Sequence, residues 1–106
     1  MNILFVCSRN QWRSPTAETI YKNRAGISVK SAGTEPSARI KLNSKIIEWA
    51  DIICVMEKKH KQRMLENFPI ESKRKKIVIL DIPDEYKYMD QELMNEIQSK
   101  VDEYIE

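Results

Sequence analysis

Cysteine, histidine and glycine are scarce in this chain of 106 residues, which contains two cysteines, one histidine and two glycines. The two cysteines, Cys7 and Cys54, are too few for the disulfide framework of a small secreted domain. No cluster of cysteine, histidine and carboxylate residues has the spacing of a metal site. No apolar run approaches the ~20 residues of a membrane-spanning helix, and Met1 leads straight into an apolar run without room for a signal peptide. We therefore expect no membrane association, no structural disulfide and no metal.

The charge and the length of the chain narrow its class further. The formal net charge is +2, which is too small to indicate a nucleic-acid partner. A length of 106 residues, of which 42% are hydrophobic, predicts a single domain over residues 1–106 with a small core. The sequence has no internal repeat, no low-complexity segment and no linker.

Near the start of the chain, Cys7 is followed after five residues by Arg13 and Ser14, which gives the motif Cys-x5-Arg-Ser. The apolar residues 3–6 in front of it predict a buried strand. Pro15 suits the first turn of a helix, and we expect Ser14 to be the N-cap of that helix. The loop therefore lies between a strand and a helix N-terminus, where free backbone N–H groups and the helix dipole attract an anion.

The residue types in this loop fit a phosphate site. Backbone N–H groups of such a loop can converge on one anion, and the planar guanidinium of Arg13 matches two phosphate oxygens. In this positive field we expect Cys7 to be a thiolate at neutral pH, with the Ser14 hydroxyl donating to it. Asn10 tolerates the left-handed backbone that a tight curl needs. A cysteine that ends a buried strand is more often a small hydrophobic residue, but the strand, loop and helix around this motif favour a nucleophile.

Apolar periodicity divides the rest of the chain into alternating strands and helices. Such alternation predicts a parallel sheet with helices on both faces, which is a three-layer α/β sandwich. Residues 27–31 alternate apolar and polar side chains, as an edge strand does, whereas the other three strands are almost continuously apolar, as buried strands are. The expected strands are residues 2–6, 27–31, 52–56 and 77–80, and the expected helices are residues 16–24, 43–49, 58–67 (closed by Pro69) and a last helix capped by Asp90.

Four segments carry sequence landmarks in a fixed order: residues 6–18 (VCSRNQWRSPTAE), 31–34 (SAGT), 50–56 (ADIICVM) and 82–86 (IPDEY). The first resembles the active-site loop of the low-molecular-weight protein tyrosine phosphatases, whose usual form is V-C-x-G-N-x-C-R-S-P-x-A-E. The others resemble the S-A-G-T, A-D-x-I-x-x-M and V-P-D-P-Y stretches of the same family. The similarity is greatest to a short bacterial branch of predicted tyrosine phosphatases. It implies a four-stranded sheet of order 2-1-3-4, in which the first and fourth strands end at the same edge.

The resemblance implies a phosphomonoester hydrolase that acts through a cysteinyl-phosphate. Cys7 would attack phosphorus, Arg13 would hold the phosphoryl oxygens, and Asp84 would protonate the leaving oxygen, with Asp81 as the rival acid. The implied substrate is a phosphotyrosine-containing protein or a small aryl phosphate, and the implied chemistry needs no metal or organic cofactor. A catalytic thiolate needs a reducing compartment, so we expect the protein in the cytoplasm. The residues expected to bind substrate are Ser8, Arg9, Asn10, Gln11, Trp12, Ser14 and Tyr86.

Three residues depart from the family pattern. Arg9 stands in place of a glycine, Trp12 in place of a second cysteine, and Glu85 in place of the proline after the acid. The chain is also shorter than typical members, and much of the loss falls between Thr34 and Asp51. We expect these departures to affect substrate preference and rate more than the chemistry.

Three other functions are open on the sequence alone. A phosphate- or phosphopeptide-binding module with little catalysis would use the same loop. Thiol-dependent arsenate reduction normally passes oxidising equivalents along further cysteines, and only Cys54, inside an expected strand, is available. A phosphoryl-carrier protein would require neither Arg13 nor Asp84. We expect His60 to be a packed structural residue with no catalytic role, and the sequence leaves the physiological substrate and the oligomeric state open.

Overall fold

A four-stranded parallel sheet forms the centre of the computed structural model, which describes residues 1–105. The strands are β1 (Asn2–Cys7), β2 (Ser28–Gly33), β3 (Ile52–Val55) and β4 (Lys76–Ile79), and they lie in the order β2-β1-β3-β4. Each strand begins and ends within two residues of its expected position. The strand order that the resemblance implies is confirmed, and it makes β1 a central strand.

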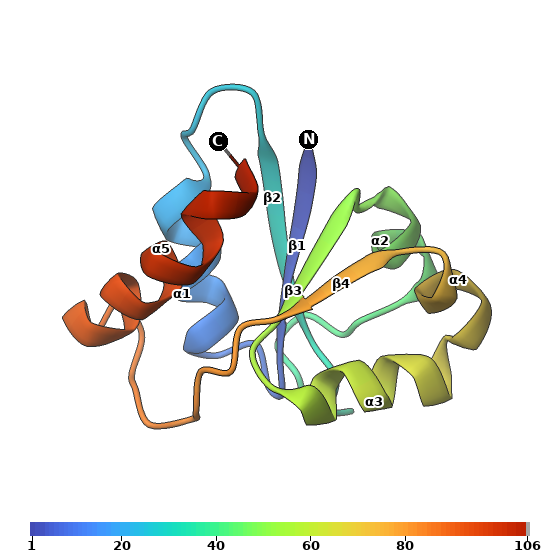
Figure 1. Cartoon of the computed structure of the whole chain (residues 1–106). Coiled ribbons are helices and arrows are strands. Elements are labelled where there is room, and N and C mark those ends of the chain that lie inside the picture. Colours follow the sequence, from blue (N-terminus) through green and yellow to red (C-terminus); the bar gives the residue numbers. More distant parts are fainter. Residues whose placement is uncertain (106) are drawn as a thin grey trace.

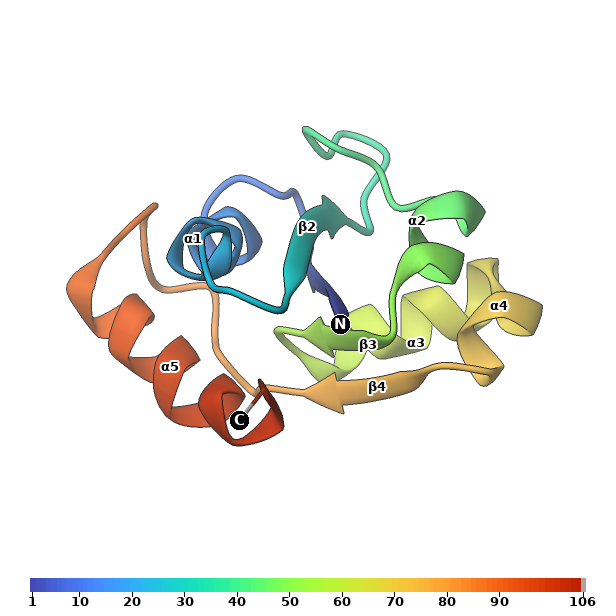
Figure 2. The ribbon, with the colours of Figure 1, turned by 90° about the horizontal axis from the view of Figure 1, so that it is seen from above.

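Helices cover both faces of the sheet, as Figures 1 and 2 show. One face carries α1 (Arg13–Tyr21) and α5 (Gln91–Ile105). The other carries α2 (Ser44–Trp49), α3 (Lys58–Asn67) and α4 (Pro69–Lys73). The predicted three-layer α/β sandwich is confirmed. Over residues 1–105, every helix is too short or too polar to cross a lipid bilayer.

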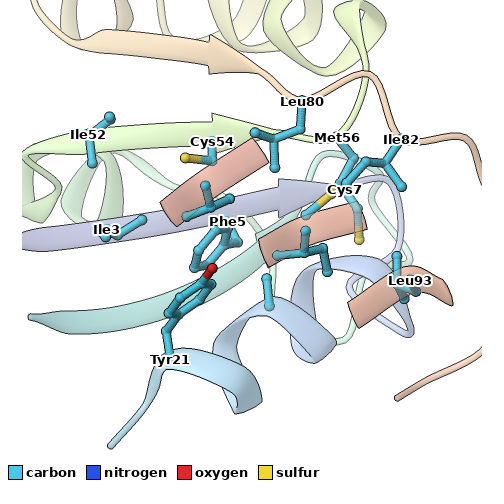
Figure 3. Packing of buried hydrophobic residues seen from close by; sticks show 13 residues of the cluster. Ile3, Phe5, Cys7, Tyr21, Ile52, Cys54, Met56, Leu80, Ile82 and Leu93 are labelled. Carbon is cyan, nitrogen blue, oxygen red and sulfur yellow. The ribbon is translucent and has the colours of Figure 1, made fainter. Parts of the chain in front are cut away.

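The central strand β1 is buried on both faces because helices flank it on each side. Phe5 and Cys7 point into one core with α1 and α5, where the rings of Phe5 and Tyr21 stack with their centroids 6.0 Å apart (Figure 3). Leu4 and Val6 point into a second core with α2 and α3. Burial on both faces explains the continuous apolar sequence of this strand. It also fixes Cys7 at the end of a rigid element.

One prediction about local structure is wrong, and one short helix was not predicted. β4 is not a buried strand: it lies at the edge of the sheet, and Ile79 keeps 39% of its surface exposed. Its apolar sequence is typical of a central strand, so periodicity alone does not reveal the edge position, which follows only from the strand order that the family resemblance implies. Pro69 follows the end of α3 as predicted, but it also opens the short helix α4, because a proline fits the first turn of a helix. The predicted cap of α5 is confirmed, since Asp90 Oδ1 accepts from the N–H of Glu92 at 2.9 Å.

Gly33, the last residue of β2, lies against the loop that follows β1. A Cβ atom at this position would lie 2.6 Å from the carbonyl oxygen of Ser8 and 2.6 Å from the Cβ of Ala38. Such distances are too short for any side chain, so glycine is required here. The absence of a side chain lets the loop after β2 pack directly on the Cys7 loop.

Candidate active site

The Cys7 loop opens into a small pocket at the carboxyl edge of the sheet. β1 ends at Cys7 and α1 begins at Arg13, so the loop joins a strand to a helix N-terminus as predicted. In a doubly wound sheet, ligands bind at this edge where neighbouring connections leave on opposite faces. The cavity has a volume of about 90 Å³ and is lined by Cys7, Ser8, Arg9, Gln11, Trp12, Arg13 and Asp84.

The predicted N-cap role of Ser14 is wrong. α1 begins one residue before Ser14, at Arg13, and Trp12 occupies the cap position without a side-chain cap. The carbonyl oxygen of Trp12 accepts from the N–H of Thr16 at 3.1 Å and from its hydroxyl at 2.6 Å. The hydroxyl of Ser14 instead lies 2.9 Å from the sulfur of Cys7. A hydroxyl that points at the sulfur is not available to the helix N–H groups.

Asn10 orients the groups that surround the sulfur. Its backbone is left-handed (φ 57°), as predicted, and this lets its N–H donate to Cys7 Sγ at 3.2 Å. Its side-chain Nδ2 donates to the hydroxyls of Ser14 and Ser31, each at 2.9 Å. Ser31 in turn donates to the carboxylate of Glu18 at 2.5 Å, which fixes the direction of the whole chain of bonds. Since Ser14 accepts from Asn10, its own hydrogen is directed to Cys7.

The sulfur of Cys7 is therefore the acceptor of two convergent hydrogen bonds, from the Asn10 N–H and the Ser14 hydroxyl. A thiolate, unlike a thiol, is a strong acceptor, so these two donors are placed to stabilise negative charge that a reaction brings to the sulfur. Cys7 also lies at the N-terminal end of α1, where the helix dipole favours negative charge.

The loop that follows β2 supports the Cys7 loop from behind. The N–H groups of Thr34, Glu35 and Arg39 donate to the carbonyl oxygens of residues 7, 8 and 9, each at 3.0 Å. Arg39 Nε donates to the next carbonyl oxygen, that of Asn10, at 3.1 Å. Because these carbonyl groups are engaged outside the pocket, the peptide N–H groups of the loop are left to face an anion.

Arg9 fits this loop although the family pattern has glycine at its position. Asn10 takes the left-handed conformation, and the φ of Arg9 is not positive, so its side chain meets no backbone strain. The guanidinium of Arg9 is 61% exposed and lies 3.6 Å from Glu35. An exposed cation is thus added to the wall of the pocket.

The Arg13 side chain is buried and is held by three oxygen atoms. Its Nη1 donates to Glu57 Oε1 at 2.5 Å and to the carbonyl oxygen of Ile82 at 2.9 Å. Its Nε lies 3.7 Å from Asp84 Oδ1. Burial acts to raise the pKa of Glu57, but the hydrogen bond and charge of Arg13 outweigh it and hold that pKa below its ordinary value. Sequence reasoning missed Glu57; its position directly after β3, at the same edge as Cys7, was the available signal.

The two candidate acids occupy different places. Asp84 lines the Cys7 pocket with 56% of its side chain exposed, so it can meet a bound ligand from the solvent side. Asp81 lines a separate hollow beside Lys100 and Tyr104, and its carbonyl oxygen accepts from Lys100. The structure thus brings Asp84, and not Asp81, to the sulfur.

The remaining predicted residues divide between the rim and the core. Gln11 and Trp12 line the pocket, and Trp12 keeps 41% of its surface exposed. Tyr86, which we expected to bind substrate, is not among the residues that line the pocket, and it packs partly buried against the core formed with α1 and α5. Cys54 is buried in β3, and burial raises the pKa of its thiol to about 12. His60 is packed as predicted, with 1% of its surface exposed, but its ring also contacts Ser8.

Within residues 1–105, no group of three or more histidine, cysteine or carboxylate residues is arranged to hold a metal ion. The charged groups at the pocket are instead the buried guanidinium of Arg13 with its carboxylate partners and the exposed guanidinium of Arg9. Such a cradle is suited to an oxyanion rather than to a cation.

Comparison with known proteins agrees with this geometry. Residues 2–47, from β1 through the Cys7 loop to α2, match the family model of the low molecular weight phosphotyrosine protein phosphatases. The matched segment contains Cys7, Arg13 and Ser14, so the similarity to this family includes the whole Cys7 loop. A protein-arginine-phosphatase of Geobacillus stearothermophilus is 33% identical over 91 residues, covering 63% of this chain and 62% of that protein. This chain thus aligns with less than two thirds of the length of that curated relative.

Solved structures of low molecular weight phosphatases superpose on nearly the whole chain. The YwlE arginine phosphatase of G. stearothermophilus has a TM-score of 0.74 and 25% identity, covering 98% of this chain and 92% of that one. A low molecular weight protein tyrosine phosphatase of T. tengcongensis has a TM-score of 0.78 and 21% identity, covering 99% and 97%. The shared fold extends beyond the residues that the family model matches.

Proposed function

We propose that this chain is a cysteine-dependent phosphomonoester hydrolase that acts on phosphoproteins, with phosphotyrosine as its preferred substrate class. The observation that carries the proposal is the position of the Cys7 sulfur. It accepts hydrogen bonds from Asn10 and Ser14 in a pocket that also contains Arg13 and Asp84. A nucleophile, an oxyanion cradle and an acid at one small pocket are the groups that covalent phosphoryl transfer requires.

In the first step, the Cys7 thiolate attacks phosphorus and the bond from phosphorus to the leaving oxygen breaks. Arg13 and the loop N–H groups hold the equatorial oxygens, where charge must be stabilised. Asp84, protonated at this stage, donates its proton to the leaving oxygen. The products are a cysteinyl-phosphate and a free hydroxyl compound.

In the second step, water attacks the phosphorus of the cysteinyl-phosphate. The Asp84 carboxylate takes a proton from that water, and the sulfur departs as a thiolate. Ser14 donates its hydrogen bond to the sulfur as negative charge returns to it. Inorganic phosphate is released and Asp84 is protonated for the next cycle. No step needs a metal or organic cofactor, and a reducing compartment such as the cytoplasm would keep the thiolate active.

The preference for an aryl phosphate is supported by Trp12. Its half-exposed indole lies at the rim of the pocket, where an aromatic leaving group can stack on it. A second substrate class is favoured by the relative from G. stearothermophilus, which is a protein-arginine-phosphatase. Hydrolysis of a phosphotyrosine peptide against a phosphoarginine peptide of the same sequence distinguishes the two. A higher kcat/KM for the phosphoarginine peptide would contradict the preference.

Turnover of para-nitrophenyl phosphate by the purified chain tests the hydrolase. We expect Cys7→Ser to abolish turnover while inorganic phosphate still binds, because the cradle is mostly backbone, and Arg13→Ala to lose both. Cys54→Ala is the matched control, since Cys54 lies away from the pocket, and it should retain turnover. Turnover by pure Cys7→Ser protein would contradict the covalent mechanism. Phosphate binding without turnover by the unmodified chain would favour the binding-module alternative.

A further inference from the structure

The imidazole of His60 lies between the start of α3 and the Cys7 loop, and both of its nitrogen atoms are engaged. Nδ1 is 3.0 Å from the backbone nitrogen of Glu57, which donates to it. Nε2 is 2.8 Å from the hydroxyl oxygen of Ser8. The first contact belongs to the capping box of α3. The second connects the helix to the pocket.

The first contact sets the direction of the second. A backbone N–H can only donate, so Nδ1 must be the bare acceptor nitrogen of the ring. A neutral imidazole carries one hydrogen, which therefore resides on Nε2 and is donated to Ser8. Burial, reinforced by the charge of Arg13, lowers the pKa of His60 to about 4, so the ring is neutral at neutral pH.

The hydroxyl of Ser8 is consequently turned toward the pocket. Its oxygen accepts from His60, so its own hydrogen has to be donated elsewhere. Over residues 1–105, the Ser8 hydroxyl makes no hydrogen bond other than the one to His60. Ser8 lines the same cavity as Cys7 and Arg13. An oxyanion in that cavity is the acceptor within reach of the hydrogen.

We propose that His60 is a positioning residue that holds the Ser8 hydroxyl as a hydrogen-bond donor to the oxyanion bound in the Cys7 pocket. The N-terminal end of α3 then aligns two donors at once, because Glu57 holds Arg13 while His60 holds Ser8. This inference deepens the proposed function, and rests on it only in that the pocket binds a phosphoryl group.

Inorganic phosphate is the probe, and its affinity is measured by calorimetry at neutral pH. In His60→Asn, the short amide oxygen can still accept from the Glu57 N–H but cannot reach Ser8. In His60→Gln, the longer amide can donate to Ser8. We expect Ser8→Ala and His60→Asn each to weaken phosphate binding by about tenfold or more, as for a hydrogen bond to a charged group. His60→Gln should retain most of the affinity.

The double variant of Ser8→Ala with His60→Asn separates positioning from mere packing. If His60 acts through Ser8, the double variant binds phosphate as weakly as Ser8→Ala alone. Losses that multiply in the double variant, or unchanged affinity in His60→Asn, would overturn the proposal. Urea unfolding checks that the variants fold. Should His60→Asn fail to fold, unchanged phosphate affinity in Ser8→Ala would overturn the proposal by itself.

These measurements need no turnover, so they separate the inference from the proposed hydrolase. A chain that binds phosphate with the expected coupling between Ser8 and His60, but hydrolyses no aryl phosphate, would contradict the proposed function and leave the role of His60 intact. A chain that hydrolyses aryl phosphate but shows no coupling between Ser8 and His60 in phosphate binding would support the proposed function and overturn the role of His60.

Discussion

The carboxylate of Glu57 lies 2.5 Å from the guanidinium of Arg13 and is the nearest countercharge to that buried cation. The two residues come from the ends of different elements, since Arg13 begins α1 and Glu57 caps α3. The pair holds the guanidinium with its Nε toward Asp84. An arginine fixed in this way loses little side-chain freedom when an oxyanion binds.

Replacing Glu57 tests how far the buried arginine depends on this countercharge. Glu57→Gln keeps a hydrogen-bond acceptor and removes the negative charge. We expect the free energy of unfolding to fall by about 1–3 kcal/mol, less than for a fully buried pair because Glu57 is partly exposed. Saturating phosphate supplies a new countercharge, so it should stabilise the variant more than the parent. Equal stabilisation of both proteins in urea unfolding would show that Glu57 does not neutralise Arg13.

Asp84 can be tested through the leaving group. Asp84→Asn should slow the hydrolysis of phosphate esters with poor leaving groups by about 10²–10⁴-fold, the usual contribution of a general acid. Esters of acidic phenols should be affected less, because they depart without a proton. Rates measured over a series of aryl phosphates check this, with Asp81→Asn as the control that lies in another hollow. A uniform loss across the series, or a selective loss in the control, would assign the acid elsewhere.

His60 makes the stability of the fold depend on pH. Burial and then the charge of Arg13, with Lys59 adding to it and Glu57 opposing, lower its pKa to about 4, whereas an unfolded histidine titrates near about 6.5. Between these values only the unfolded chain takes up the proton, so stability is lost as the pH falls. The loss should be about 2 kcal/mol between pH 7 and pH 5. Urea unfolding at both values measures it.

His60→Asn is the matched control for this measurement, because asparagine can keep the cap of α3 and does not titrate. Its unfolding free energy should change less between pH 7 and pH 5 than that of the parent. Equal changes in the two proteins would mean that another group causes the pH dependence.

Sequence periodicity predicted the layers of this fold because strands and helices are encoded locally. The Cys7 loop could be predicted equally well, since its motif, the left-handed Asn10 and the helix that follows are contiguous in the sequence. Periodicity alone predicted β4 wrongly as a buried strand, because this strand has the composition of a central one, and its edge position followed only from the strand order that the family resemblance implied. The cap role of Ser14 failed for a tertiary reason. The Ser14 hydroxyl forms hydrogen bonds with Asn10 and Cys7 instead of with the N–H groups of the helix.

The contacts that Glu57 and His60 make at the start of α3 could not be predicted from the Cys-x5-Arg-Ser motif. Glu57 and His60 lie 44 and 52 positions from the residues that they contact in the Cys7 loop. Their contacts exist because β3 lies beside β1 and delivers the start of α3 to the same edge. A packed histidine on an apolar helical stripe has the same sequence signature whether or not it touches a pocket. Only the register between β1 and β3 shows whether such a histidine reaches the pocket.

The same register governs the redox chemistry of the two cysteines. Cys54 lies opposite Phe5, two residues before Cys7, so both cysteines face one core but are diagonal neighbours (Figure 3). Strand spacing and rise place their Cα atoms about 8 Å apart, beyond the limit of about 7 Å for a disulfide.

With tryptophan in place of a second loop cysteine, peroxide should therefore convert Cys7 to sulfinic or sulfonic acid through the sulfenic acid. Bound phosphate should slow this oxidation by covering the sulfur. Mass spectrometry of peroxide-treated protein measures the products, and Cys54→Ala should give the same products at the same rate. A dominant Cys7–Cys54 crosslink, with activity restored by a reductant, would contradict the prediction and revive arsenate reduction.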